Sequence, residues 1–331
     1  MDDLRAEYTR DVTPAMFRRV LLGDPELKKA GKKVLESGPG DNVFIFFTDH
    51  GAPNLIGFPN GELYARQLQD IFTNMNKKKG YNSLVMYVEA CYAGSMFENL
   101  LPTNMRIFVT TAANAHESSW ASFCDDPKVG TCLADAYSYT WMSDSEHHDL
   151  KSWTLSNQFQ FVKNHVQSSH VMEYGDMKLS NTAVAAFQAG DRRPLLSNKR
   201  NTAKLEALDS RPAVQAHLVH LMHRIKMANT QDKQERAHRH LNRVLELAKM
   251  AQETMDEIVH DVTQQAATPV ARNDVNSHLD CYETVFENYK TKCFSIQQVP
   301  EVAQELRKLD QLCKQGYEVE KIVQAIFDVC G

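Results

Sequence analysis

Residues 85–96 read VMYVEACYAGSM, an apolar run that ends in a carboxylate, a thiol and several small residues. A continuous apolar run of this length is typical of a strand that is buried on both faces of a parallel sheet. Glu89 and Cys91 therefore come where the predicted strand ends. A free cysteine is more often a small core residue than a reactive one, so the surrounding sequence has to decide what Cys91 does.

Two similar runs flank this strand. NVFIFFTD at 42–49 precedes it and RIFVTTAA at 106–113 follows it. Between the first two runs, residues 61–79 carry apolar side chains at helical spacing and end in three lysines before Gly80, which predicts a helix. Alternation of strands and helices predicts an α/β fold with a mainly parallel sheet flanked by helices.

Two more helices are expected in this half of the chain. The pair Thr13-Pro14 is a favourable start for a helix near 14–22. The spacing of apolar residues predicts another helix around 149–167.

The character of the sequence changes after residue 190. The polar, basic and turn-rich segment that follows predicts an exposed linker over 191–229. Residues 231–264 contain no glycine or proline and predict one long helix or two closely joined ones. Further amphipathic segments lie near 277–290, 299–314 and 317–329. We therefore expect an α/β domain at 1–190 and a small all-α domain at 230–331.

The bulk composition excludes several classes of protein. Hydrophobic residues make up 43% and charged residues 24% of the 331 residues, as in ordinary globular proteins. The net charge of −5 gives no electrostatic reason to expect a nucleic acid or an anionic membrane as partner. No apolar stretch is long enough to span a bilayer, and the charged N-terminus lacks the apolar core of a signal peptide.

Seven cysteines divide unevenly along the chain. Four of them lie in the last 51 residues, which predicts a disulfide framework and an oxidising compartment. A zinc site is the alternative, but no C-x-x-C pair supports it. Cys91 is then the candidate free thiol. A disulfide-bonded chain without a signal peptide suggests that its natural start is missing.

Histidines gather in one part of the second half. His217, His220 and His223 form H-x-x-H-x-x-H, and five of the 13 histidines lie between 217 and 240. On a helix the three would not share one face, so a pH-sensitive surface is favoured over a metal site. We expect neither a metal nor a cofactor.

His50 and Cys91 occupy equivalent places in the predicted sheet. Each follows a buried strand, and ligands of open α/β sheets bind beyond the carboxyl ends of the strands. A thiol and an imidazole brought together in this way are the minimum for nucleophilic catalysis. Gly51 lets the backbone approach a substrate, and its N–H could join that of Cys91 as an oxyanion hole.

Four strings of residues, in order, make the family identifiable: FIFFTDHG, YVEACYAGSM, VTTAANAHESSW and CLADAYSYTWM. They resemble the legumain family of asparaginyl endopeptidases, also called vacuolar processing enzymes, and the resemblance covers nearly the whole chain. It implies a caspase-like sheet, here lacking its first strand, followed by a helical prodomain.

The resemblance also implies individual roles. Cys91 would be the nucleophile and His50 the general acid and base, with Gly51 helping to bind the oxyanion. Asp49 matches an aspartate that the family converts to a succinimide. Asn229 falls at the point of self-cleavage.

The same resemblance places Glu89, Ser118, Ser119 and Asp135 around the pocket for the residue before the cleaved bond. The chemistry fits, because carboxylates accept hydrogen bonds from the amide NH₂ of an asparagine and hydroxyls can orient it. An ionised aspartate would be repelled there and tolerated only once it is protonated at acid pH.

Spacing and resemblance together suggest three disulfides, namely Cys281–Cys313, Cys293–Cys330 and Cys124–Cys132. The resemblance further implies protein and peptide substrates, the chain's own prodomain as inhibitor, and inhibitors of the cystatin type. For the full-length protein it implies a lysosome, a vacuole or secretion. The prodomain is expected to dock over His50 and Cys91. Its electrostatic attraction to the site is expected to weaken in acid, when the histidines become charged and the carboxylates neutral.

The sequence thus predicts the zymogen of a cysteine endopeptidase that cuts after Asn, and after Asp at acid pH. One alternative is a peptide ligase that uses the same thioester. Another is a truncated isoform that binds peptides without cutting them.

Overall fold

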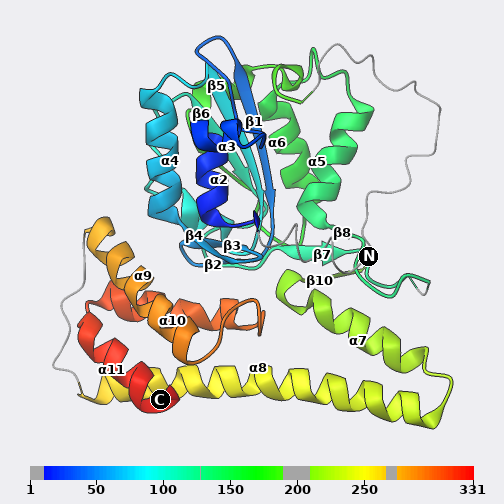
Figure 1. Cartoon of the computed structure of the whole chain (residues 1–331). Helices are drawn as coiled ribbons and strands as arrows, with labels where there is room; N and C mark the ends of the chain where they lie inside the picture. Colours follow the sequence, from blue (N-terminus) through cyan, green and yellow to red (C-terminus); the bar gives the residue numbers. More distant parts are fainter. Residues whose placement is uncertain (1–10, 127, 189–208, 266–273) are drawn as a thin grey trace.

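The computed structural model describes residues 11–126, 128–188, 209–265 and 274–331 (Figure 1). A four-stranded sheet lies at the centre of the first half, in the order β1-β5-β6-β9. The first three strands are parallel and β9 is antiparallel to β6. The expected mainly parallel sheet is confirmed. Its strands are β1 (Asn42–Thr48), β5 (Ser83–Glu89), β6 (Ile107–Thr111) and β9 (Met172–Gly175).

Helices cover both faces of this sheet because successive side chains of a strand point to opposite faces. From β1, Val43, Ile45 and Phe47 pack in one core, while Phe44 and Phe46 pack against the other. The first core is shared with α4, and the second with α5 and α6 (Figure 1). Among the described residues of this half, the helices are α2 (Pro14–Leu21), α3 (Pro25–Lys29), α4 (Ala65–Lys77), α5 (Ala136–His147) and α6 (Leu155–His165).

The helix expected over 61–79 begins only at Ala65. Residues 61–64 form β4 instead, which pairs with β3 in a hairpin. Gly61 has φ 99°, a backbone conformation that glycine adopts without steric cost and that makes this turn possible. Apolar spacing could not separate the two outcomes, because a strand paired to a neighbour also buries Leu63 and Tyr64. At the start of α2, Thr13 caps the helix as expected, accepting from the Met16 N–H at 3.0 Å.

Two small sheets lie beside the main one, in the orders β2-β3-β4 and β10-β7-β8. Their strands are β2 (Gly51–Ala52), β3 (Leu55–Phe58), β4 (Gly61–Tyr64), β7 (Trp120–Ser122), β8 (Ala134–Asp135) and β10 (Ser210–Pro212). Short 3₁₀ helices complete the connections, namely η1 (Ala93–Met96), η2 (Met177–Asn181), η3 (Val184–Ala186) and η4 (Ala213–Gln215).

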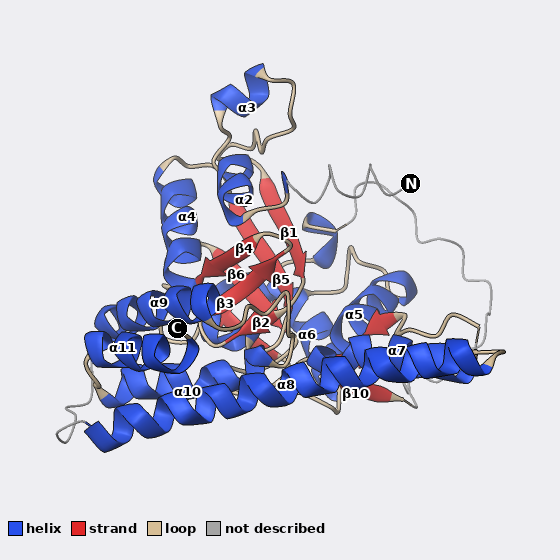
Figure 2. Cartoon of the chain, turned by 60° about the horizontal axis from the view of Figure 1, so that its bottom comes forward, coloured by secondary structure: helices blue, strands red, loops and turns tan. Residues whose placement is uncertain are grey.

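The second half is helical, as expected. Residues 231–265 form one continuous helix, α8, which decides between the two alternatives left by the sequence. Figure 2 shows α8 as a long rod with α7 lying along one end of it. The helices are α7 (Ala216–Lys226), α8 (Gln231–Gln265), α9 (Val275–Lys292), α10 (Val302–Gln315) and α11 (Val319–Cys330).

Three disulfides are present, and they are the pairs that spacing and resemblance suggest: Cys281–Cys313, Cys293–Cys330 and Cys124–Cys132. The first two join helices of the second half. Cys91 remains a free, buried thiol.

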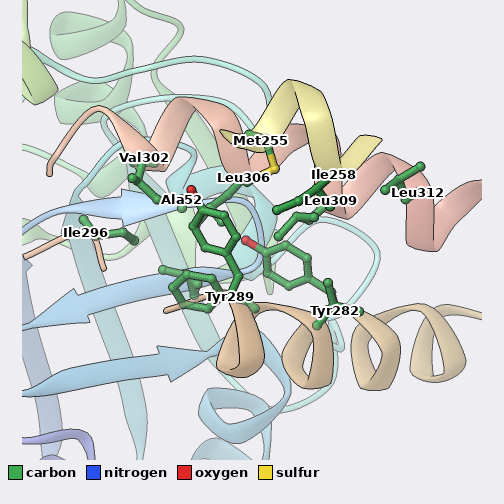
Figure 3. Close-up of a cluster of buried hydrophobic side chains, with 14 of the residues drawn as sticks. Ala52, Met255, Ile258, Tyr282, Tyr289, Ile296, Val302, Leu306, Leu309 and Leu312 are labelled. Carbon is green, nitrogen blue, oxygen red and sulfur yellow. The ribbon is translucent and has the colours of Figure 1, made fainter. Parts of the chain in front are cut away.

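The two halves share one hydrophobic core (Figure 3). Side chains of α8, α9 and α10 form most of it, and Ala52 reaches it from β2. Leu55, Tyr64, Cys91 and Tyr92 of the first half belong to the same cluster. The helices therefore cover the sheet edge at which β5 ends.

The segment 191–229, expected to be a linker, contains β10, η4 and α7 in its described part, while 191–208 lie outside the described residues. The N-terminal residues considered for a signal peptide also lie outside them. Within the described ranges, none of the helices combines the length and apolar character needed to cross a membrane.

Candidate active site

His50 and Cys91 follow the ends of neighbouring parallel strands. The register of β1 and β5 pairs Thr48 with Glu89, so both chains leave the sheet at the same edge. Tyr92, directly after the thiol, has φ 56°, a left-handed conformation that is uncommon outside glycine. The Tyr92 N–H donates to the Glu117 carbonyl at 2.8 Å, which holds this sharp turn. The turn places the thiol at the exit of the strand.

Gly51 lies directly against the backbone of Cys91. A Cβ atom at position 51 would stand 2.2 Å from the Cys91 carbonyl oxygen and 3.0 Å from the Ala90 Cβ. Only glycine fits without displacing main-chain atoms. The backbone that carries His50 is thereby kept in contact with the backbone that carries the thiol.

Cys91 is 1% exposed. Its Sγ lies 3.5 Å from the hydroxyl oxygen of Ser119. Burial raises the pKa of Cys91, hydrogen bonding by Ser119 and Ser118 opposes that rise, and the charge of Glu89 adds to it. The resting group is therefore a protonated thiol, and a base is needed to turn it into a nucleophile.

His50 has the properties of that base. Burial lowers the pKa of its imidazole, while the charge of Asp49 opposes the shift. Two residues of the helical half also act on it, since His217 of α7 lowers and Glu301, just before α10, raises the pKa of His50. A neutral imidazole can accept a proton from a thiol.

Asp49 lies with its carboxyl group against the following peptide. The His50 N–H donates to Asp49 Oδ1 at 2.6 Å. Burial raises the pKa of Asp49, and the hydrogen bond from the His50 N–H opposes that rise. Closure of a succinimide joins this side-chain carboxyl carbon to this backbone nitrogen, so the two reacting groups are neighbours.

Glu89 is 2% exposed and is held by the start of α5. Its Oε2 accepts from the Ser138 N–H at 2.9 Å and from the Ser138 hydroxyl at 2.8 Å. Oε1 is buried and has no hydrogen-bond partner among the described residues. Burial, followed by the charge of Asp135, raises the pKa of Glu89 to about 8, and the Ser138 bonds oppose that rise.

Ser138 is a site residue that sequence reasoning missed. It lies in the first turn of α5, where backbone N–H groups are free to bind an anion. The sequence does contain one indication of this role, because Ser138 follows Asp135 by three residues at the start of a helical segment.

Asp135 lies at the N-cap of α5 and lines a cavity of about 830 Å³ together with Thr48 and Ser138. Burial raises the pKa of Asp135 to about 6. Ser118 and Ser119 hydrogen-bond to Cys91, and the charge of Asp135 acts on Glu89. The two carboxylates and the two serines expected for the pocket are therefore near one another, although of these four only Asp135 lines the cavity.

Asn229 is not part of this group. It lies exposed in the turn between α7 and α8, where its side-chain oxygen accepts from Lys233 Nζ at 3.0 Å. In this state of the molecule it is a surface residue of the helical half.

The chain is similar to several known proteins and to one family model. A model of the peptidase C13 family matches residues 3–190. The chain is 39% identical to a protein named hemoglobinase from Schistosoma japonicum over 322 residues, covering 97% of this chain and 75% of the relative. It is 35% identical to mouse legumain, covering 98% of this chain and 75% of the relative. It is also 33% identical to a vacuolar-processing enzyme from Vicia sativa, covering 100% and 73%. The chain therefore belongs to the peptidase C13 family, the legumain-type cysteine endopeptidases.

Proposed function

We propose that this protein hydrolyses peptide bonds after asparagine, with Cys91 as nucleophile and His50 as general acid and base. The observation that carries the proposal is the contact of Gly51 with the Cys91 backbone. It holds the imidazole-bearing and thiol-bearing turns together at one sheet edge.

The reaction follows from the groups present. The neutral imidazole of His50 takes the proton of the Cys91 thiol, and the thiolate attacks the carbonyl carbon of the scissile bond. The N–H groups of Gly51 and Cys91 donate to the oxyanion of the tetrahedral intermediate. The protonated imidazole then gives its proton to the leaving amine, which yields a thioester. Water, deprotonated by His50, releases the acid product and the thiol.

The pocket favours an amide side chain. Glu89 Oε1 and Asp135 can accept from an asparagine NH₂, and the hydroxyls of Ser118 and Ser119 can orient it. An aspartate side chain would meet two carboxylates and be repelled while all are ionised. The pKa of Glu89 is raised to about 8, so this group is largely protonated at neutral pH and Asp135 carries the repelling charge. Acidification through the Asp135 pKa of about 6 neutralises the pocket, which then admits an aspartate that is itself protonated.

The helical half would keep the enzyme latent. Cys91 is buried in the core that α8, α9 and α10 build, so a substrate cannot reach it without movement of these helices. Polar contacts add to this docking and consist of Asn54 with Asp310, Tyr64 with Glu287, Gln67 with Glu283, Arg66 with Asp280, and Glu62 with Lys290 and Gln297.

Acid would weaken the docking at Glu283, because burial raises the pKa of this carboxylate and its protonation weakens the hydrogen bond that it accepts from Gln67. His217 Nε2 lies 3.4 Å from Glu301 Oε1, and this contact joins two residues of the helical half rather than the two halves. Cleavage after Asn229 would be carried out by a second, active molecule, because Asn229 is exposed whereas the thiol of the same chain is covered.

A lysosomal or vacuolar setting fits this scheme. Disulfides point to the secretory route, and one relative is named a vacuolar-processing enzyme. Activation at acid pH would then coincide with arrival in an acidic compartment.

The test is cleavage of fluorogenic peptides that end in Asn, Asp or Gln, after incubation at acid pH. Cleavage should be fastest for Asn, and Cys91→Ala should abolish it without loss of the folded state, as judged by circular dichroism. Retention of activity by Cys91→Ala, or equal rates for Asn and Gln, would refute the proposal.

A further inference from the structure

A segment of the helical half runs as a strand along the sheet that borders the thiol. β10 pairs antiparallel with β7, with Ser210 opposite Ser122 and Pro212 opposite Trp120. The next residue continues the ladder, since the Ala213 N–H donates to the Ser119 carbonyl at 2.9 Å. The hydroxyl of Ser119 in turn lies 3.5 Å from the thiol.

This arrangement is the one by which extended peptides add to an open sheet edge. β8 occupies one edge of β7, and β10 takes the other. A proline is tolerated in β10 because an edge strand does not need every N–H. The backbone groups that hold β10 are therefore those that a bound peptide strand would use.

β10 runs toward the thiol, so each of its residues can be numbered backward from the point where a bound substrate would be cut. Ala213 bonds to the residue whose hydroxyl contacts Cys91, so it stands where the residue before a cleaved bond would stand. Arg211 then lies two residues earlier. Ala213 has a methyl group in place of a carboxamide, and η4 begins there, so the chain leaves the extended conformation that a scissile bond requires.

Asp125 faces the residue at that earlier position. Arg211 Nη2 lies 3.6 Å from Asp125 Oδ1, and the Asp125 side chain is 67% exposed. The Asp125 N–H donates to Asp209 Oδ2 at 2.6 Å, which fixes the loop that presents the carboxylate. Among the described residues, Arg211 is the ion-pair partner of the Asp125 carboxylate.

We propose that a substrate lies along β7 in the place of residues 210–213, and that Asp125 selects a basic side chain two residues before the asparagine. Residues 210–213 occupy the place of that substrate without being cleaved. This inference rests on the proposed peptidase function. The place of the substrate along β7 and the selectivity of Asp125 can nevertheless both be tested by peptide binding, without cleavage.

The first experiment measures hydrogen–deuterium exchange at the Ala213 amide in the full chain. Arg211→Glu and Asp125→Lys should each speed exchange roughly two- to fivefold, as expected for an exposed ion pair. The double variant should return it toward the starting rate, because the charges are exchanged. Asp70→Lys, the same charge change at an exposed position of α4, should leave it unaltered. A double variant no slower than the single variants would overturn the pairing.

The second experiment adds short peptides to the weakened chains. With Arg211→Glu, acetyl-Ser-Arg-Pro-Asn-amide should displace the internal strand and speed exchange at Ala213 more than acetyl-Ser-Glu-Pro-Asn-amide. With Asp125→Lys the order should reverse. Equal effects of the two peptides would overturn the role of Asp125, and no effect of either would overturn the placement of a substrate along β7. Loss of peptidase activity alone would count against the proposed function and not against this placement.

Discussion

The carboxylate of Glu89 and the N-terminal turn of α5 are joined through Ser138, which donates both its backbone N–H and its hydroxyl to Oε2. The other oxygen, Oε1, is buried without a hydrogen-bond partner among the described residues. A buried carboxylate that is half satisfied resists ionisation. Glu89 therefore changes its protonation state near neutral pH.

This predicts how stability depends on pH. The pKa of Glu89 is raised from 4.5 to about 8, so between these values the folded protein holds a proton that the unfolded chain has released. Stability should fall as the pH rises through this window. Glu89→Gln cannot titrate and should make the fall shallower, by up to about 1.4 kcal/mol per pH unit.

Chemical denaturation across this pH range measures the effect. Glu98→Gln, which alters an exposed carboxylate, is the matched control and should leave the slope as it is. An unchanged slope in Glu89→Gln would contradict the raised pKa. A residual slope from Asp135 is expected in either case, because its pKa is also raised.

Lys290 should stabilise the docked state of the two halves. Its Nζ lies 2.8 Å from Glu62 Oε2 and 2.7 Å from Glu287 Oε1, and the Glu62 side chain is 1% exposed. Lys290→Met keeps most of the side-chain volume but leaves the Glu62 charge buried and less compensated, at a cost of about 3–5 kcal/mol.

Urea denaturation and hydrogen exchange in β4 and α9 report this loss. Lys249→Met removes a lysine whose ion pair with Glu253 is exposed on both sides, and should change stability by less than about 1 kcal/mol. Equal effects of the two substitutions would show that the buried contact does not hold the halves together.

Asp310 should stabilise the protein except in strong acid. Asn54 Nδ2 and His278 Nε2 each lie 2.7 Å from Oδ1, and Lys314 Nζ lies 2.8 Å from Oδ2. Burial raises the pKa of Asp310, but the His278 hydrogen bond and the Lys314 charge bring it below 3.8. The ionised group therefore contributes stability above pH 3.8, which is lost as the pH falls through the lower folded value.

Asp310→Asn should lower the free energy of unfolding at neutral pH by roughly 1.5–3 kcal/mol, the contribution typical of a hydrogen bond to a charged group. The difference from wild type should shrink once the pH is taken below 3.8. Asp328→Asn, at an exposed position of α11, is the control. A difference that stays constant down to strong acid would contradict the lowered pKa of Asp310.

The disulfides should differ in their contribution to stability according to loop length. Cys293–Cys330 closes a separation of 37 residues and Cys124–Cys132 one of 8. Loop entropy predicts about 4 kcal/mol for the first and about 2.5 kcal/mol for the second. Thermal unfolding of the two double alanine variants compares them, and a larger loss for Cys124→Ala/Cys132→Ala would contradict the ranking.

The sequence alone indicated the sheet and the two reactive positions. β1, β5 and β6 are uninterrupted apolar runs because a strand covered on both faces needs no polar side chain. His50 and Cys91 follow two of these runs, and parallel strands end at the same edge. The helical half was equally clear, since α8 to α11 carry apolar stripes at helical spacing.

Tertiary structure decided what local patterns leave open. Residues 61–64 became β4 because β3 was available to pair with them, a partner that apolar spacing does not reveal. Ser138 reaches Glu89 across 49 residues of sequence, and β10 finds β7 across about 90, so neither contact leaves a local signal. Cys91 is likewise buried in a core to which helices far along the chain contribute. Side-chain chemistry and periodicity can be read directly from the sequence. Long-range pairing and burial arise only when distant segments pack together.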